Sequence, residues 1–416
     1  MKSFIEYSKD CHFPIQNLPY GVFNCKNNKD CRVGVAIGEL VLDLSVLEKY
    51  KILGTNYFAE PTLNKFMDAG KNIWDSVRSK IQNLLLIDNP TIRDNKKLYK
   101  EVFLNQNEVV MHLPAKIGDY TDFYSSKQHA TNVGKMFRDP DNALLPNWLH
   151  LPVGYHGRSS SIVISGTPIR RPVGQILPNN SDKPILGPSK LLDFELEMGC
   201  FIGPGNTLGK PIDINDSGNH LFGLVLVNDW SARDIQKWEY VPLGPFLAKN
   251  FATSISPWII PFAALDEFRI NNPVQVEPKP LSYLNCKEKW TFDINLEIYL
   301  NSDKCLDKTL ISRSNYKYMY WNLAQQLAHH TITGCNIKSG DLFASGTISG
   351  ESENSYGSML ELSWKGTKPV KLNNGQERKF INDGDTVMLT GYGQGDGYKI
   401  GFGEVKGKIF PPIKSI

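Results

Sequence analysis

The chain has 416 residues, of which 41% are apolar and 21% are charged, and its formal net charge is only +3. This is the composition of a folded globular protein, and the length favours two domains. The small net charge, without a block of like charges, argues against a nucleic-acid partner, and no apolar run is long enough to span a bilayer.

The cysteines predict reduced thiols. Their number is odd and no Cys-x-x-Cys pair exists, which argues against a disulfide framework or a zinc ribbon. The first residues, Met1–Glu6, lack the apolar core of a secretory signal, and the last three, Lys414–Ile416, are not the peroxisomal tripeptide. We therefore expect a cytoplasmic protein. The cysteines are Cys11, Cys25, Cys31, Cys200, Cys286, Cys305 and Cys335.

Strand and helix signals alternate in the first part of the chain. Residues 33–38 and 40–44 are typical of a β-hairpin with glycine near its turn. Residues 62–92 have apolar side chains at helical spacing. Pro114 and Gly118 then end this pattern and indicate a domain boundary.

We predict an N-terminal domain of residues 1–117 and a C-terminal domain of residues 118–416. Proline and glycine punctuate many short strands in the second, so the fold class is mainly β (α+β) and the larger domain a mostly antiparallel sandwich or roll. The predicted strands cover residues 161–165, 191–202, 221–228, 292–300, 386–390 and 398–405.

One helix and one further strand are predicted near the C-terminus. The helix begins after Ser314 or Asn315, carries an apolar stripe of Met319, Leu323 and Leu327, and ends at Gly334. Residues 357–364 are predicted as a strand, in which Glu361 points away from its neighbouring leucines.

Acidic and apolar residues alternate from Leu192 to Met198. In a strand, Asp193, Glu195 and Glu197 would share one face, which indicates either a cation site or an ordinary solvated face. Residues 292–298 show nearly the same alternation, so the pattern is not specific by itself.

Asp229 follows directly after the apolar run Leu224–Val227, where a buried strand would hold an acid at its open end. It could equally cap a following helix. A site built from carboxylates without cysteine would select a hard cation, Mg²⁺ or Ca²⁺.

His129 is the histidine best placed for proton transfer, since it lies in a polar and aromatic segment typical of functional loops. A locally hydrogen-bonded histidine is the simpler alternative. His329 and His330 are weaker candidates, and His156, which lies in a turn, could be functional or structural. The glycine-rich residues 391–397 have the wrong spacing for a dinucleotide fingerprint and indicate tight turns.

Four motifs in this order resemble the fumarylacetoacetate hydrolase family, and the similarity runs over nearly the whole chain. They are Asp119–Ser126 with His129–Gly134, Leu151–Arg158, Asp229–Gln236 and Ser345–Gly350. The resemblance implies an SH3-like N-terminal barrel, a β-sandwich roll and a homodimer. It also implies hydrolysis of a β-diketo acid, 4-fumarylacetoacetate, to fumarate and acetoacetate, the last step of tyrosine and phenylalanine breakdown.

The resemblance also implies roles for individual residues. His129 is then the base and Glu361 its partner, while Arg233, Gln236 and Lys249 lie near the developing negative charge. The implied metal residues are Asp122, Glu195, Glu197 and Asp229, with Lys249 and Thr253 close to the ion. The implied substrate-binding residues are Tyr124, Arg138, Gln236, Tyr240 and Thr347.

One position departs from the family pattern: Ala252 stands where similar proteins have glycine. Two alternative functions remain open at this stage. Related folds use such a site for decarboxylation, isomerisation or hydration of keto acids, and a β-rich interaction protein with solvated acidic strands would belong to another class.

Overall fold

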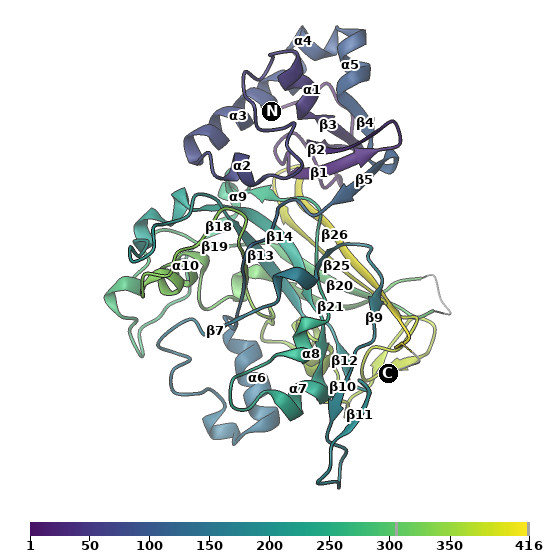
Figure 1. Ribbon diagram of the computed structural model, residues 1–416, viewed down its shortest axis with the longest axis vertical. Coiled ribbons are helices and arrows are strands. Elements are labelled where there is room, and N and C mark those ends of the chain that lie inside the picture. Colours follow the sequence, from purple (N-terminus) through teal and green to yellow (C-terminus); the bar gives the residue numbers. More distant parts are fainter. Residues whose placement is uncertain (304–306, 414–416) are drawn as a thin grey trace.

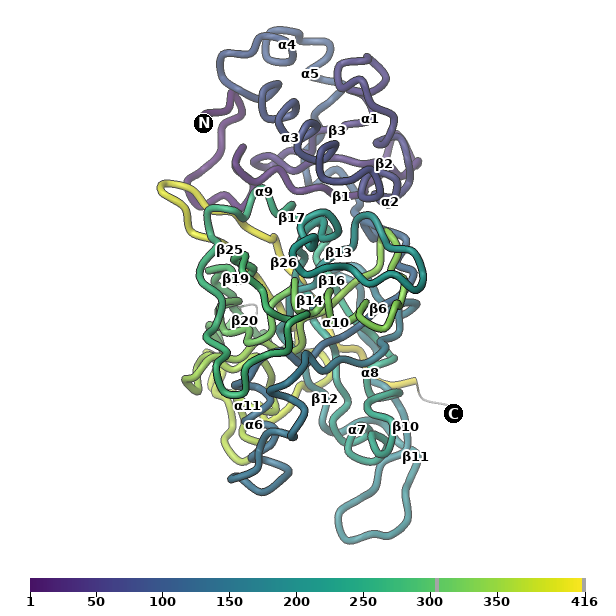
Figure 2. Tube along the Cα trace, turned by 90° about the vertical axis from the view of Figure 1, so that its left-hand side faces the viewer, coloured from purple at the N-terminus to yellow at the C-terminus, as the bar shows by residue number. Residues whose placement is uncertain are grey.

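The computed structural model describes residues 1–303 and 307–413, and it shows helices together with curled β-sheets (Figure 1). The N-terminal segments gather at one end of the molecule, and the longer remainder of the chain forms the rest (Figures 1 and 2). Six cysteines are described and all are free thiols. Cys305 and Lys414–Ile416 lie outside the described residues.

The N-terminal part is built on an antiparallel sheet of order β4-β3-β2-β1-β5. The predicted hairpin is confirmed, since Gly34 pairs with Asp43 and Ile37 with Leu40. The strands are β1 (Tyr20–Cys25), β2 (Asn28–Ile37), β3 (Leu40–Asp43), β4 (Phe103–Asn105) and β5 (Val109–His112).

The predicted helical region 62–92 is helical but interrupted. Gly70 has φ +84°, so α2 ends before it and α3 begins directly after it. The helices of this part are α1 (Leu44–Lys49), α2 (Asn64–Met67), α3 (Lys71–Leu85), α4 (Pro90–Arg93) and α5 (Lys96–Val102).

The sheet that positions the site has the order β7-β6-β22-β13-β14-β16-β8, with β17 paired to β14. Most of its pairs are antiparallel, but β6 runs parallel to β22 and β8 to β16. Its strands are β6 (Tyr120–Phe123), β7 (Gly154–His156), β8 (Ile162–Ile164), β13 (Leu196–Ile202), β14 (Leu221–Asp229), β16 (Thr253–Ile255), β17 (Ile260–Pro261) and β22 (Leu342–Ala344).

A second long sheet packs in the same core, with the order β21-β20-β25-β26-β9. It contains β9 (Ile169–Arg170), β20 (Asn295–Asn301), β21 (Thr309–Asn315), β25 (Thr386–Gln394) and β26 (Lys399–Phe410). Four two-stranded pairs complete the described strands: β10 (Val173–Ile176) with β11 (Ile185–Pro188), β12 (Leu192–Asp193) with β15 (Ser231–Ala232), β18 (Arg269–Ile270) with β19 (Thr291–Phe292), and β23 (Val370–Lys371) with β24 (Glu377–Arg378).

Two predictions near the C-terminus are wrong. Asn315 ends β21, and the helix α10 begins only at Leu323, after the cap Asn322. Residues 359–362 form a helical turn rather than a strand, because Ser358 caps it. The remaining helices are α6 (Lys127–Phe137), α7 (Arg233–Glu239), α8 (Leu247–Asn250), α9 (Phe262–Leu265), α10 (Leu323–Thr331) and α11 (Met359–Leu362).

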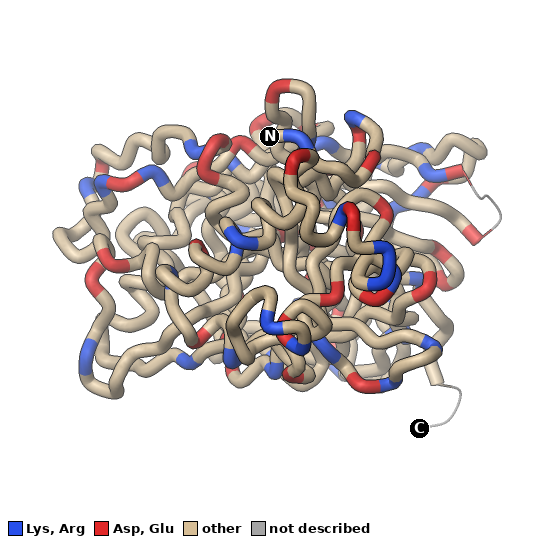
Figure 3. Tube along the Cα trace, turned by 90° about the horizontal axis from the view of Figure 1, so that it is seen from above, with Lys and Arg blue, Asp and Glu red and all other residues tan. Residues whose placement is uncertain are grey.

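The surface and the helices agree with a globular protein. Lys and Arg are interspersed with Asp and Glu in the view from above (Figure 3). Among the described residues, no helix combines the length and the apolar character that crossing a bilayer requires.

Candidate active site with a buried carboxylate cluster

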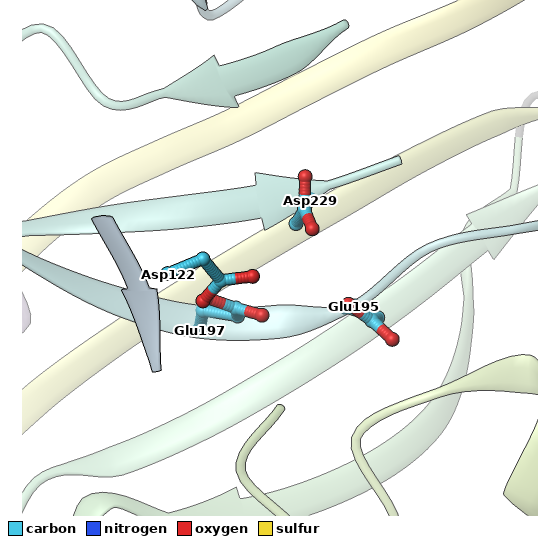
Figure 4. A group of neighbouring side chains, drawn as sticks. All are labelled: Asp122, Glu195, Glu197 and Asp229. Carbon is cyan, nitrogen blue, oxygen red and sulfur yellow. The ribbon is translucent and has the colours of Figure 1, made fainter. Parts of the chain in front are cut away.

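Four carboxylates converge within the large sheet. Asp122 lies in β6, Glu197 in β13 and Asp229 at the end of β14, while Glu195 directly precedes β13. One oxygen from each lies within 4.8 Å of the others, and all four residues are buried (Figure 4). The alternative of a solvated acidic face, left open by the sequence, is therefore wrong for Glu195 and Glu197.

Strand register explains this convergence. On β13, Gly199 pairs with Ala344 of β22, which in turn pairs with Asp122 of β6. On the other side, β13 pairs with β14, so Leu196 lies opposite Asn228, next to Asp229. Four consecutive strands, β6, β22, β13 and β14, therefore bring acids from distant parts of the sequence to one place, although β22 carries none of the four acids.

Gly346 closes one side of the cluster. Its φ is +76°, and a β-carbon there would lie 2.2 Å from the carbonyl oxygen of Phe123. Only glycine fits this close approach. The Gly346 N–H donates to Glu197 Oε2 at 3.2 Å.

The carboxylates repel one another. Burial, followed by the charges of neighbouring carboxylates, raises the pKa of Asp122 and of Glu197 well above their usual values. Burial also raises the pKa of Asp229. A cluster with this much unfavourable charge needs a cationic partner.

Two basic side chains offset part of this charge. Lys249 donates through Nζ to Glu195 and, at 2.5 Å, to Asp229 Oδ2. Arg233 donates to Glu195 Oε1 at 2.7 Å. Burial alone would raise the pKa of Glu195, but Lys249 and Arg233 outweigh it and hold that pKa well below its usual range. Asp229 also accepts from Thr253 Oγ1 at 2.9 Å.

The cluster fits a divalent cation. Asp122 Oδ1 and Glu197 Oε1 are buried acceptors without a hydrogen-bond donor, although buried polar atoms normally have a partner. Every candidate ligand atom is a carboxylate oxygen, the donor type preferred by hard ions such as Mg²⁺ and Ca²⁺.

His129 and Glu361 form a buried pair. His129 Nδ1 lies 2.7 Å from Glu361 Oε2, and the side chains are 3% and 0% exposed. Although burial would raise the pKa of Glu361, the His129 contact and other hydrogen bonds lower it. Ser358, whose hydroxyl donates to Glu361, forms a β-bridge with Glu195, so the pair lies near the carboxylate cluster.

Three further donors fix Glu361, and the sequence analysis did not identify them. Ser349 Oγ and Ser358 Oγ donate to Glu361 Oε2 at 2.8 and 2.9 Å, and Asn132 Nδ2 donates to Oε1 at 2.9 Å. Asn132 lies almost one helical turn after His129, which is the only sequence signal that could have indicated it.

Of the residues implied to bind substrate, Thr347 is buried and Tyr124 is partly buried. The ring of Tyr124 is 5.3 Å from that of His129, centroid to centroid, in an edge-on arrangement. Thr347 is 1% exposed, and its hydroxyl is a buried polar group without a partner.

The other implied substrate residues are less enclosed. Gln236 accepts from the Arg233 guanidinium at 3.1 Å. Arg138 is exposed and donates to the carbonyl of Ala143 at 2.8 Å, while Tyr240 is 51% exposed at the end of α7. The structure therefore does not bring Arg138 and Tyr240 into contact with the carboxylates.

The remaining candidates have other partners. His156 is exposed, His329 contacts the Tyr283 hydroxyl at 2.9 Å, and His330 contacts Thr121 Oγ1 at 2.9 Å. Ala252 is buried in the core, and its φ is not positive, so the backbone there does not require glycine. The added methyl group is accommodated.

Two domain families match the chain. The family described as "Fumarylacetoacetase N-terminal" matches residues 16–114, and "Fumarylacetoacetate (FAA) hydrolase C-terminal" matches residues 119–409. The second alone covers more than half of the chain.

Curated relatives match at full length. The chain is 57% identical to fumarylacetoacetase from Homo sapiens, covering 99% of each chain. It is also 57% identical to fumarylacetoacetase from Dictyostelium discoideum, covering 100% of this chain and 99% of the relative. A solved fumarylacetoacetate hydrolase from Exiguobacterium antarcticum shares the fold, with a TM-score of 0.53, 16% identity, and coverage of 95% and 99%.

Proposed function

Because the chain belongs to the fumarylacetoacetase family, we propose that it hydrolyses the carbon–carbon bond of fumarylacetoacetate to give fumarate and acetoacetate. The observation that supports this most strongly is the buried His129–Glu361 pair beside four convergent carboxylates. In the family this reaction is the last step of tyrosine and phenylalanine breakdown.

The carboxylates would hold a divalent cation, Mg²⁺ or Ca²⁺, through Asp122, Glu195, Glu197 and Asp229, with Lys249 and Thr253 beside it. When bound, such an ion supplies Lewis acidity, which polarises a carbonyl oxygen and helps to orient a diketone.

His129 acts as the general base. Its Nδ1 is held by the Glu361 carboxylate, which is an acceptor, so Nδ1 carries the proton and Nε2 is left free to accept one. A water molecule gives one of its own protons to Nε2. The resulting hydroxide attacks the carbonyl carbon next to the double bond. Glu361 stabilises the imidazolium that forms.

Attack places negative charge on the carbonyl oxygen, and basic side chains stabilise it. Arg233, Gln236 and Lys249 lie together at the carboxylate cluster and supply the donors. Loss of one such donor typically costs about 3–4 kcal/mol in the transition state. The carbon–carbon bond then breaks, its electron pair leaves with the acetoacetate carbon, and the proton on Nε2 is returned to that carbon.

We assign substrate orientation to two groups of residues, one beside His129 and one at the outer edge of the site. Tyr124 and Thr347 line the inner part beside His129, and the Thr347 hydroxyl has an unused hydrogen-bonding capacity. Tyr240, Gln236 and Arg138 contact the substrate from the rim. For Arg138 this means exchanging the Ala143 carbonyl for a substrate carboxylate.

Replacing His129 by alanine tests this function. We expect fumarate release to fall at least about 10²-fold, because the general base is lost, while divalent-ion binding by calorimetry persists. His329→Ala is the matched control, since His329 contacts only a tyrosine hydroxyl. Unchanged turnover in His129→Ala would contradict the assignment. Carbon dioxide release without fumarate would indicate a decarboxylase instead.

We also propose the domain division of residues 1–117, an SH3-like barrel, and residues 118–416, a β-sandwich roll. The five-stranded antiparallel sheet of the N-terminal part supports the first unit. Limited proteolysis should cut first between Pro114 and Gly118 if this segment connects two units. A cytoplasmic location is supported by the six free thiols among the described residues.

A homodimer is the assembly that the apolar surface supports. The α7–α8 connection exposes several large apolar side chains, and Trp238 Nε1 donates to Gln175 of β10 at 3.2 Å, which joins this surface to the β10–β11 hairpin. Such a contiguous patch is typical of an interaction surface. Its exposed members are Trp238, Tyr240, Val241, Leu243, Phe246, Leu247, Ile185 and Leu186.

A further inference from the structure

Asp193 has no role in the reaction described above, yet it is fully buried beside the residues that have one. It ends β12, two residues before Glu195, and it is 0% exposed. Each oxygen accepts two hydrogen bonds. Oδ1 accepts from the amides of Phe194 and Met359 at 2.8 and 2.7 Å, and Oδ2 from the amide of Leu360 at 3.0 Å and from Arg233 Nε at 2.8 Å.

These bonds join the two halves of the site. Met359 and Leu360 are the first two residues of α11, the helical turn that carries Glu361. Arg233 uses its other nitrogens for Glu195 and Gln236. One carboxylate therefore contacts both the turn that presents the partner of His129 and the guanidinium beside the carboxylate cluster.

Local structure alone does not require this arrangement. The cap of α11 is Ser358, whose hydroxyl already accepts from the amide of Glu361. The charge of Arg233 is already met by Glu195. What Asp193 adds is the fixed position of the turn relative to the guanidinium, because Leu360 and Arg233 bind the same oxygen, Oδ2, while Met359 binds the other.

We propose that Asp193 is a positioning residue for the hydrolysis: it holds Glu361, and through it His129, in register with Arg233. This inference rests on the proposed function. Misplacing catalytic groups by about 1 Å can lower a rate by about 10²-fold. His129 and Arg233 act on the transition state and not on the unreacted substrate. A change in their positions should therefore lower kcat and leave KM largely unchanged.

Asp193→Asn keeps the size of the side chain but replaces one acceptor oxygen by a donor, so it cannot face both the amides and Arg233. We expect kcat to fall about 100-fold with KM changed less than about threefold. Asp43→Asn is the matched control. Asp43 is also buried, accepts from Arg32 at 2.6 Å and caps α1 at Ser45, but it lies in the N-terminal part. Its variant should lose stability and keep kcat.

A second pair of variants tests the same contact without altering Asp193, in case Asp193→Asn does not fold. Proline suits the first position of a helix, so Met359→Pro removes the amide that donates to Asp193 while the turn can still form. Met359→Ala loses the same side chain but keeps the amide. Met359→Pro should therefore have a kcat at least about tenfold below that of Met359→Ala.

Hydrogen exchange supplies a readout that is independent of turnover. In Asp193→Asn the amides of Met359 and Leu360 should exchange faster, and in Asp43→Asn the change should be confined to α1. If the wild-type protein releases no fumarate, the proposed function is refuted. Hydrogen exchange at Met359 and Leu360 then decides whether Asp193 fixes the turn. Active wild type, with kcat unchanged in Asp193→Asn or equal in the two Met359 variants, would overturn the inference.

Discussion

Glu197 illustrates how a single buried side chain can be unfavourable for the fold and useful for the site. One of its oxygens accepts from Gly346, while the other is buried without a donor. Its pKa is raised by burial and by Asp122 and Asp229. The free energy of folding of the metal-free protein therefore includes a repulsion that a bound cation would relieve.

Glu197→Gln should change stability and ion binding in opposite directions. The neutral amide removes one charge from the cluster, so we expect the metal-free variant to melt at a higher temperature than wild type. Loss of a ligand should weaken Mg²⁺ or Ca²⁺ binding more than about 100-fold, since changing a residue that only hydrogen-bonds to a ligand already costs about 10- to 100-fold. Melting curves with and without the ion, together with calorimetry, measure both effects.

Glu297→Gln is the control for this variant. Glu297 lies in the other alternating acidic segment, where it pairs with Arg313 and Tyr299 instead of with other acids. Its ion response should equal that of wild type. If Glu197→Gln retains full ion affinity, Glu197 is not a ligand.

At this scale the sequence predicted the alternation of acidic and apolar residues, but neither the break between β12 and β13 nor the surroundings of the acids. The alternation around Glu197 and around Glu297 is nearly the same, and only the first is enclosed by β6, β14 and β22. Burial depends on strands from separate parts of the chain, which periodicity cannot reveal. The donor Asn132 was missed for the same reason, since it is 229 residues from Glu361. Ser349 and Ser358 are closer in sequence, and their bonds were missed because residues 359–362 were predicted as a strand.

At the scale of elements, the long strands and the hairpin were predicted because their apolar runs are long and their turns contain glycine. The short elements were not. Residues 359–362 are too few to distinguish the apolar spacing of a helix from that of a strand. The contacts that favour a helical turn come from Ser358 and Asp193. The start of α10 was misplaced because Asn315 and Asn322 are both good caps, and only β21 decides between them.

The element α10 carries a pH-sensitive histidine. Burial, with a smaller contribution from His156, lowers the pKa of His330 to about 4. As the pH falls below about 6.5 the unfolded chain takes up a proton that the folded protein accepts only near pH 4, so stability is lost between these values. Partial exposure limits the expected loss to roughly 1–2 kcal/mol.

His330→Gln should remove this part of the acid sensitivity, because glutamine does not titrate. Urea unfolding at pH 7 and pH 4.5 measures it: the loss of unfolding free energy should be smaller in the variant by roughly 1 kcal/mol. The neighbouring His329 also lowers the pKa of His330, whereas Asp119 raises it. Equal losses in both proteins would show that His330 is protonated as readily in the fold as in the unfolded chain.

At the scale of the whole molecule, the apolar surface of the α7–α8 connection bears on assembly. Leu243 is 95% exposed, and Val241 and Phe246 are 66% and 62% exposed. Leu243→Glu should therefore leave the fold intact and shift a dimer toward monomer, because a charge would be buried at the interface.

Light scattering at several protein concentrations tests this assembly. Leu208→Glu is a suitable control, since Leu208 is 73% exposed but lies apart in sequence from the α7–α8 connection. Wild type that stays monomeric at all concentrations would refute the dimer. A dimer that persists in Leu243→Glu would place the interface elsewhere.

The parallel pairing of β6 with β22 has a consequence for biosynthesis. Asp122 of β6 is aligned with Ala344 of β22, which is translated 222 positions later (344 − 122). This pairing therefore cannot form until β22 has been synthesised. At typical elongation speeds this delay is roughly 10–45 s. During that interval β6 can pair only with β7, and the emerging polypeptide displays an unfinished sheet edge on the side that β22 later covers. Chaperone demand should consequently peak before residue 344 leaves the exit tunnel.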